Sequence, residues 1–293
     1  MLLIHHNDND GKLSAAVVLF NLSGQLREPI TLMEMDYKDT FRPEALIPDE
    51  MVYIVDFSLR VEEMESLLAR TDRVYWFDHH KSSIDKYKDF PHQIAGIREE
   101  GARAGCRLVW DWFNDDVSGK NYSPDHPPYN PPLVVELVSD YDTWTLADER
   151  SKFLNYGLQA HDTNPSNRVG LWRVLLTDNA ETLKVVEGGK AVLGFVQRRG
   201  LELARSYGYV TEILGHRVFV MHNPNPGMDW FWLLRDKADV FARVAFDGRN
   251  YSVSLYSEKV DVEEIARQFG GGGHSGAAGF VSPTFPWAPT SKL

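Results

Sequence analysis

The chain has very little cysteine, since Cys106 is the only one among 293 residues. A single cysteine excludes an internal disulfide and a zinc site built from several thiolates. Long apolar runs are also missing: no stretch approaches the roughly 18 consecutive apolar residues of a membrane span, and residues 1–4 are too short for the apolar region of a signal peptide. We therefore expect a cytoplasmic protein with no membrane association.

Basic charge is scarce as well. Lysine and arginine number 31 against 42 aspartates and glutamates, which gives a formal net charge of -11. Binding to a long duplex depends on clustered Lys and Arg side chains that neutralise phosphates, so this composition argues against a long duplex as partner. Small or short anionic substrates stay open, because bound divalent cations would offset acidic charge locally.

Short apolar runs alternate with helical patterns in the first half of the chain. The expected strands cover residues 2–5, 30–35, 51–55 and 74–77, and a helix is expected over 14–20. Between the last two strands, Val61, Met64, Leu67 and Leu68 lie at i, i+3, i+6 and i+7, the apolar stripe of a crossover helix. This order predicts an α/β fold whose N-terminal domain has a parallel sheet with helices on both faces.

The second half predicts a different, smaller α/β domain. Residues 115–132 contain five prolines in a polar context and indicate a surface loop before a helix over 133–138. The remaining expectations are a linking helix over 184–208, strands of a smaller sheet over 216–221, 240–246 and 251–256, a helix over 262–269 and an arm or frayed tail over 283–293. We divide the chain into domains 1–180 and 181–293.

Acidic and histidine residues follow directly on three of the expected strands. They are His6, Asp8 and Asp10 after the first, Asp56 after the third, and Asp78, His79 and His80 after the fourth. Because the carboxyl ends of parallel strands meet at one edge of a sheet, these side chains should gather in one site. Mixed carboxylate and imidazole donors suit Mn²⁺ or a similar divalent ion.

Each cluster also has an ordinary structural explanation when taken alone. The spacing of the first cluster resembles a calcium loop, but the twelfth position is Val17 instead of the bidentate glutamate that such a loop requires. An Asx turn between strand and helix explains the first cluster, and a surface tripeptide explains Asp78-His79-His80. The joint occurrence after neighbouring strands favours the metal site.

A glycine run, Gly270 to Gly273, precedes His274 near the end of the chain. Successive glycines let backbone N–H groups wrap a phosphate, and the histidine can add a hydrogen bond or charge. The alternative is a flexible linker, which is the usual meaning of a glycine tract. An expected helix before the run and a compact apolar segment after it favour the phosphate site.

In this order the motifs resemble the DHH phosphoesterase superfamily with its DHH-associated C-terminal domain, over nearly the whole chain up to Ser282. They are His6-Asn-Asp8-Asn-Asp10-Gly11, Asp56 in Val-Asp-Phe, Asp78-His79-His80, Asp140, and Gly-Gly-Gly-Gly-His-Ser-Gly-Ala-Ala-Gly over residues 270–279. The first motif is most similar to the oligoribonuclease, or nanoRNase, branch. The resemblance implies an active site in the cleft between the two domains.

The resemblance also implies two divalent metal ions, usually manganese, and roles for individual residues. The implied metal ligands are His6, Asp8, Asp10, Asp56, His79 and Asp140, and the implied catalytic residues are His80, Asp56 and Asp78. Asp56 would bridge the two ions, and His80 would face the substrate phosphate. Many relatives carry the first histidine at the position of Ile4, so His6 is its expected substitute here. Asp142 is either an outer partner or an alternative to Asp140.

For substrate binding, the resemblance implies a nucleotide cradle at Gly271, Gly272, Gly273 and His274. Related hydrolases commonly have the sequence Ser-x-Arg-Ser before this loop, whereas this chain has Tyr256 in place of the arginine. A tyrosine can stack on a base or hydrogen-bond a phosphate, but it lacks the positively charged guanidinium that binds a phosphate through two hydrogen bonds. Arg103 is a candidate for a phosphate contact, with a solvent-facing residue at a helix start as the alternative.

The expected function is manganese-dependent hydrolysis of short RNA or DNA oligonucleotides. Other enzyme readings are cyclic dinucleotide hydrolysis, removal of the 3′-phosphate from a bisphosphorylated adenosine nucleotide, single-strand DNA exonuclease activity and polyphosphate cleavage. A nucleotide-binding sensor without turnover is the non-enzyme alternative, and its cleft would not require a complete set of metal ligands. Homodimers are common among such folds, and a homodimer is compatible with the expected function.

Overall fold

The computed structural model describes residues 1–24, 29–101, 103–114, 130–166, 170–224, 227–285, 287 and 291–292. Most of the expected loop over residues 115–132 lies outside this set. The chain forms two compact units, Met1–Lys190 and Ala191–Leu293. The assignment of a catalytic and a substrate-binding domain to these units stays a prediction.

A four-stranded parallel sheet organises the first unit, as the sequence pattern predicted. Its strands are β1 (Leu2–His6), β2 (Thr31–Met35), β3 (Val52–Val55) and β4 (Val74–Phe77), in the order β2-β1-β3-β4. All three strand pairs are parallel. The carboxyl ends of β1, β3 and β4 therefore lie side by side at one edge of the sheet.

Helices cover both faces of this sheet because its strands are apolar on both sides. Along β1, Leu3 packs into one hydrophobic cluster, whereas Leu2 and Ile4 pack into the other. Side chains alternate between faces along a strand, so a sheet buried on both sides needs continuous apolar runs. The runs that marked the strands in the sequence are thus explained by two separate cores.

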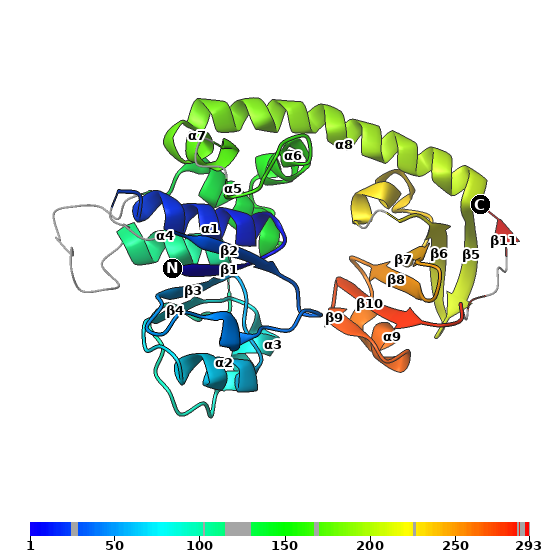
Figure 1. The fold of residues 1–293 in the computed structure, drawn as a ribbon. Helices are drawn as coiled ribbons and strands as arrows, with labels where there is room; N and C mark the ends of the chain where they lie inside the picture. The colour runs from blue at the N-terminus through cyan, green and yellow to red at the C-terminus, as the bar shows by residue number, and fades with distance from the viewer. Residues whose placement is uncertain are drawn as a thin grey trace. The chain divides into compact units, whose positions relative to one another are not determined.

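The larger core contains residues of α1 (Asn9–Asn21), α4 (Gly105–Asn114), α5 (Leu133–Asp142), α6 (Glu149–Leu158), α7 (Leu171–Thr177) and α8 (Asn179–Tyr207). The opposite core contains residues of α2 (Val61–Leu68), as the apolar stripe predicted. Figure 1 shows α1 and α4 on one side of the sheet and α2 on the other. Short helical turns complete the unit at η1 (Pro43–Ala45), α3 (Lys81–Ile84) and η2 (Asp85–Tyr87).

The helix after β1 begins earlier than expected. We predicted a turn followed by a helix from Ser14, but α1 starts at Asn9 and takes in Asp10 and Gly11. The reason is that Asp8 caps the helix, accepting a hydrogen bond from the backbone N–H of Gly11 at 2.9 Å. The acidic motif therefore lies at a rigid helix start.

The second unit contains a mixed seven-stranded sheet among the described residues. Its strands are β5 (Gly208–Ile213), β6 (His216–His222), β7 (Val240–Phe246), β8 (Tyr251–Tyr256), β9 (Gly272–His274), β10 (Ala277–Ser282) and β11 (Ser291–Lys292). Their order is β11-β5-β6-β7-β8-β10-β9, with α9 (Val262–Gln268) packed against β8, β9 and β10, and a 3₁₀ segment η4 (Met228–Leu234). The expectation of a smaller sheet was wrong, because short strands such as β9 and β11 carry no alternating pattern of their own.

The C-terminal segment is an arm and is not frayed where it is described. Trp287 is buried in the core of the second unit, and β11 pairs with β5. Across the described residues no helix combines the length and the apolar character needed to span a bilayer; even the long α8 carries charged residues along its length.

The glycine run is a strand turn and not an open linker. Residues 272–274 form β9, which pairs with β10, and both Gly270 and Gly273 have positive φ angles of 77° and 145°. A Cβ added at Gly271 would lie 2.0 Å from the carbonyl oxygen of Gly279, whereas one added at Gly272 would have no atom within 4 Å. Packing therefore explains why residue 271 is a glycine, whereas no contact requires a glycine at position 272.

This contrast gives a matched pair of substitutions. Gly271→Ala should lower the free energy of unfolding by roughly 1–3 kcal/mol, the usual cost of overpacking against rigid backbone. Gly272→Ala should change it by less than about 0.5 kcal/mol, as at an open surface position. Urea unfolding of the two variants measures the difference, and equal losses would contradict the packing described for this turn.

Candidate metal centre

The first motif is fixed by the junction of β1 and α1. Asp8 uses one carboxylate oxygen to cap α1, and its other oxygen accepts from Nδ1 of His6 at 2.7 Å. Nδ1 of His6 also lies 3.7 Å from Oδ2 of Asp56. Burial lowers the pKa of His6, but the neighbouring Asp8 raises it more. His6, the substitute for the histidine missing at position 4, thus reaches the site.

Asp10 lies two residues further, in the first turn of α1, and is almost fully buried. Its two oxygens accept from the backbone N–H groups of Gly105 at 2.7 Å and Cys106 at 2.8 Å. These are the first residues of α4, and the partial positive charge of a helix N-terminus favours a carboxylate there. Burial together with the charge of Asp142 nevertheless raises the pKa of Asp10.

Asp56 is the most constrained carboxylate of the site. It follows β3 directly, is fully buried, and has a positive φ of 52°, a region in which aspartate is tolerated better than most residues. Neither of its carboxylate oxygens has a hydrogen-bond partner among the described residues. Burial, followed by the charges of Asp10 and Asp8, raises the pKa of Asp56 well above its ordinary value.

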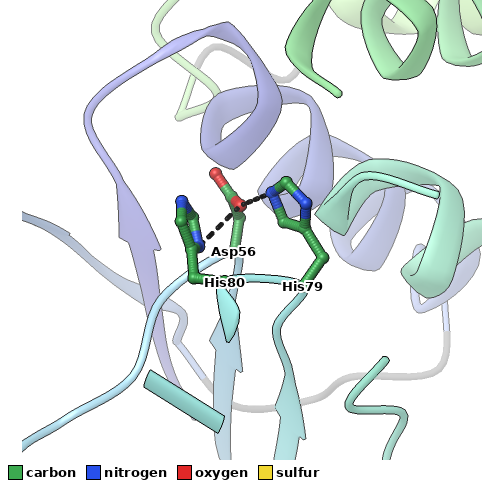
Figure 2. A group of neighbouring side chains, drawn as sticks. All are labelled: Asp56, His79 and His80. Carbon is green, nitrogen blue, oxygen red and sulfur yellow. Dashed lines mark ion pairs between the residues drawn. The ribbon is translucent and has the colours of Figure 1, made fainter. Parts of the chain in front are cut away.

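The two histidines after β4 lie on either side of Asp56 (Figure 2). Nε2 of His79 lies 3.2 Å from Oδ1 of Asp56 and 3.1 Å from Oδ2 of Asp142. Burial lowers the pKa of His79, but Asp142 and Asp10 outweigh burial and raise the pKa to about 9. A proton on His79 offsets part of the buried negative charge, and a divalent cation could take its place.

His80 is held differently from its neighbour. Asp78 accepts from both the backbone N–H of His80 at 3.0 Å and its Nδ1 at 2.7 Å, and the hydroxyl of Ser58 donates to the other oxygen of Asp78. Burial raises the pKa of Asp78, but these hydrogen bonds lower it further. Since Nδ1 of His80 is engaged by Asp78, the ring's Nε2 is left as its reactive nitrogen.

The structure brings together all predicted metal ligands except one. Asp140 lies away from the cluster: its carboxylate accepts from the backbone N–H of Ala147 at 2.9 Å and of Asp148 at 3.2 Å. Asp142 takes the place expected for Asp140. The sequence contains a signal for this, because Val135, Val138 and Asp142 lie at i, i+3 and i+7 on one face of α5.

The donor atoms form three overlapping groups, each within 4.8 Å. These are His6, Asp8 and Asp56; Asp10, His79 and Asp142; and Asp56, His79 and His80. Carboxylate oxygens and imidazole nitrogens are donors for Mn²⁺, Fe²⁺ or Zn²⁺, and the orphaned oxygens of Asp56 lie at the point where two groups meet. The residues therefore fit a divalent metal centre.

Glycines make room for this centre, and sequence reasoning missed one of them. A Cβ added at Gly105 would lie 2.6 Å from Cβ of Asp56 and 2.9 Å from Oδ2 of Asp10. One added at Gly11 would lie 2.5 Å from the carbonyl oxygen of His6. Ser58 was also missed, and no local pattern distinguishes its hydroxyl from that of any other serine.

The predicted substrate-binding residues are occupied by other contacts where they are described. The guanidinium of Arg103 pairs with Glu99 and lies 2.9 Å from Asp111. Tyr256 is buried in a hydrophobic cluster, and its hydroxyl accepts from the N–H of Gly227 at 2.8 Å. Both side chains thus have partners within the protein, and their role in substrate binding stays a prediction. The side chain of His274 lies outside the described residues.

Comparisons with known proteins establish the fold. No model of a protein family matches the chain. An uncharacterized protein of Acanthamoeba polyphaga mimivirus is 23% identical over 247 residues, covering 80% of this chain and 54% of that protein, so the chain spans about half the length of this curated relative.

Two solved structures superpose on nearly the whole chain. The pGpG-specific phosphodiesterase PggH from Vibrio cholerae has a TM-score of 0.54 at 16% identity, covering 96% of this chain and 93% of that one. The DHH domain of a member of the s1p family of ribosomal proteins has a TM-score of 0.56 at 15% identity, covering 96% and 82%. The chain therefore has the same fold as these two proteins, in line with the fold that the sequence motifs imply.

Removing the charge of Asp56 tests whether this buried carboxylate destabilises the metal-free protein and binds the metal. Asp56→Asn should raise the free energy of unfolding of the metal-free protein by roughly 1–3 kcal/mol, since it removes a buried carboxylate that lies beside other carboxylates, and each unit of pKa shift corresponds to about 1.4 kcal/mol. The same substitution should abolish the stabilisation that Mn²⁺ gives the wild type, about 2.7 kcal/mol at a hundredfold excess over the Kd. Urea unfolding with EDTA or with Mn²⁺ measures both. Full Mn²⁺ stabilisation of the variant would contradict a role for Asp56.

A second pair of variants separates the two acids of α5. Asp142→Asn should weaken Mn²⁺ binding by at least about tenfold, because it removes a charge beside His79. Asp140→Asn should leave Mn²⁺ affinity unchanged and lower stability by about 0.5–2 kcal/mol, as for a lost capping carboxylate. Isothermal titration calorimetry with Mn²⁺ compares them, and the reverse pattern would restore Asp140 as the ligand.

Proposed function

We propose that this chain, which has the DHH fold, is a manganese-dependent phosphodiesterase that hydrolyses short oligonucleotides at a two-metal site. The observation that carries the proposal is the position of Asp56, whose buried oxygens belong to two of the three donor groups. A carboxylate shared between groups is what a bridge between two ions requires. Asp56 accepts no hydrogen bond among the described residues, and its close neighbours are the imidazoles and carboxylates of the same site.

The residues divide naturally between two ions. His6, Asp8 and Asp56 would hold one ion, and Asp10, His79 and Asp142, together with Asp56, would hold the other. When bound, two such ions polarise the phosphoryl oxygens and lower the pKa of the attacking water. The four carboxylates also provide the charge that keeps two divalent cations in place.

Asp78 and His80 lie beside these metal ligands and have different roles. Asp78 accepts from Nδ1 of His80, which orients the ring and fixes which nitrogen faces outward. We assign to Nε2 of His80 a hydrogen bond to a phosphoryl oxygen or the leaving oxygen of the scissile bond. Ser58 donates to Asp78 and so holds the orienting carboxylate. Asp78 is therefore a positioning residue, and His80 contacts the substrate.

Short substrates are favoured over long ones by charge. The net charge of -11 disfavours a long polyanion, and in the described part of the chain Arg103 and Tyr256 already have partners within the protein. The structurally similar protein PggH acts on pGpG, which is a dinucleotide. The glycine loop as a phosphate cradle, a cytoplasmic location and a homodimer stay parts of this proposal.

An assay panel with Mn²⁺ tests the function. The substrates are RNA and DNA of two to five nucleotides, cyclic dinucleotides, and the bisphosphorylated adenosine nucleotide. We expect turnover of the short linear oligonucleotides, and His80→Ala should lower kcat by about 10²- to 10⁴-fold while Mn²⁺ binding persists. Lys152→Ala, a change on α6 away from His80, serves as the control. If no substrate is turned over with any divalent ion, the result would instead favour a nucleotide-binding sensor without catalytic activity.

A further inference from the structure

A pocket of about 230 Å³ opens beside the metal centre within the first unit. Its walls are the start of α1, the second half of α5 and one face of α6, and it shares Asp8, Asp10 and Asp142 with the metal centre. It is smaller than the roughly 300–1,000 Å³ typical of sites for drug-sized ligands. It can therefore take one small group attached to the scissile phosphate, and not a dinucleotide.

The wall away from the carboxylates is neutral and polar. Ser151 of α6 is 1% exposed, and its hydroxyl has no hydrogen-bond partner among the described residues. Burial of an unpartnered hydroxyl costs free energy, so such a group in a pocket wall indicates a ligand that completes it. Nearby, the side-chain N–H of Asn9 donates to Oδ1 of Asn155 at 3.0 Å, which joins α1 to α6 across the pocket.

The charge of the lining excludes a second phosphate. Three aspartates line the pocket, and no lysine, arginine or histidine does so. An anion there would be repelled, whereas hydroxyl groups can donate to carboxylates and accept from Ser151 or amides. Val138 and Leu158 add apolar surface for a carbon ring. These features together suit a sugar.

An exposed aromatic ring continues the pocket wall outward. Tyr141 lines the pocket, and its ring stacks on Trp144 with centroids 6.0 Å apart and planes at 28°. Trp144 is 55% exposed, and Trp144 and Leu146 both have positive φ angles, of 54° and 49°. Asp140 holds this loop through the backbone of Ala147 and Asp148. Strain retained in an ordered loop is typical of functional segments, and an exposed Trp offers a face for a base.

We propose that this pocket binds the ribose of the nucleotide next to the scissile phosphate. The hydroxyl of Ser151 hydrogen-bonds a ribose hydroxyl, and the base stacks on Trp144. The proposal rests on the phosphodiesterase function and makes the substrate class RNA. It also gives Asp140 a function: this residue positions the loop that carries the stacking ring.

Matched RNA and DNA substrates test the proposal. We would measure kcat/KM with Mn²⁺ for a 5′-phosphorylated RNA dinucleotide of adenosine and its deoxy counterpart. Ser151→Ala should lower the RNA value about 3- to 10-fold, as for one lost hydrogen bond, and leave the DNA value unchanged. Trp144→Ala should lower both values by a similar factor of about 5 or more, because stacking does not depend on the 2′-hydroxyl. Glu149→Gln, at an exposed position of the same helix, should change neither.

Binding of AMP and dAMP in the presence of Mn²⁺, measured by calorimetry, provides a readout that needs no turnover. Wild type should bind AMP more tightly, and Ser151→Ala should remove the difference. Equal effects of Ser151→Ala on RNA and DNA, or no effect on either, would overturn the ribose pocket while the phosphodiesterase function stands. Absence of turnover in the wild type would overturn the phosphodiesterase function, and the AMP and dAMP affinities would then decide the pocket by themselves.

Discussion

A single buried carboxylate determines how the first unit is arranged. Asp56 lies at the end of β3 in a strained backbone conformation, with no hydrogen-bond donor among the described residues and three further aspartates nearby. Negative charge cannot be concentrated in a protein interior without protons or cations to balance it. The strand ends and helix starts around Asp56 all deliver groups toward the same point, and the absence of a side chain at Gly105 lets α4 approach it. Bound cations would offset the charge that these groups bring together.

The adjacent histidines show how one strand end serves two purposes. His79 faces the carboxylates, with Nε2 close to both Asp56 and Asp142, whereas His80 is tied through Nδ1 to Asp78. Consecutive residues leaving a strand diverge, so two neighbouring imidazoles can meet different partners. Under the proposed function, His79 would be a metal ligand and His80 would contact the substrate. The hydrogen bond from Ser58 to Asp78 extends this support into the core.

The sequence predicted the parallel sheet and the place of the site because both depend on local patterns. Apolar runs marked the strands, and acidic motifs directly after them marked the shared edge. The choice between Asp140 and Asp142 was left open, although the helical spacing of Val135 and Val138 favours Asp142. Tyr256 could not be recognised as a core residue, since that depends on the packing of η4 against β8. Gly105 and Ser58 contribute through contacts with distant residues, and such contacts leave no trace in local composition.

The most direct test of the central claim is a crystal of the protein grown with Mn²⁺ and measured at the manganese absorption edge. The account predicts two anomalous peaks about 3.5–4 Å apart, as in other two-metal sites, with the carboxylate of Asp56 between them and Asp142 in contact with one. A crystal in which manganese binds elsewhere, or in which Asp56 contacts no ion, would contradict it.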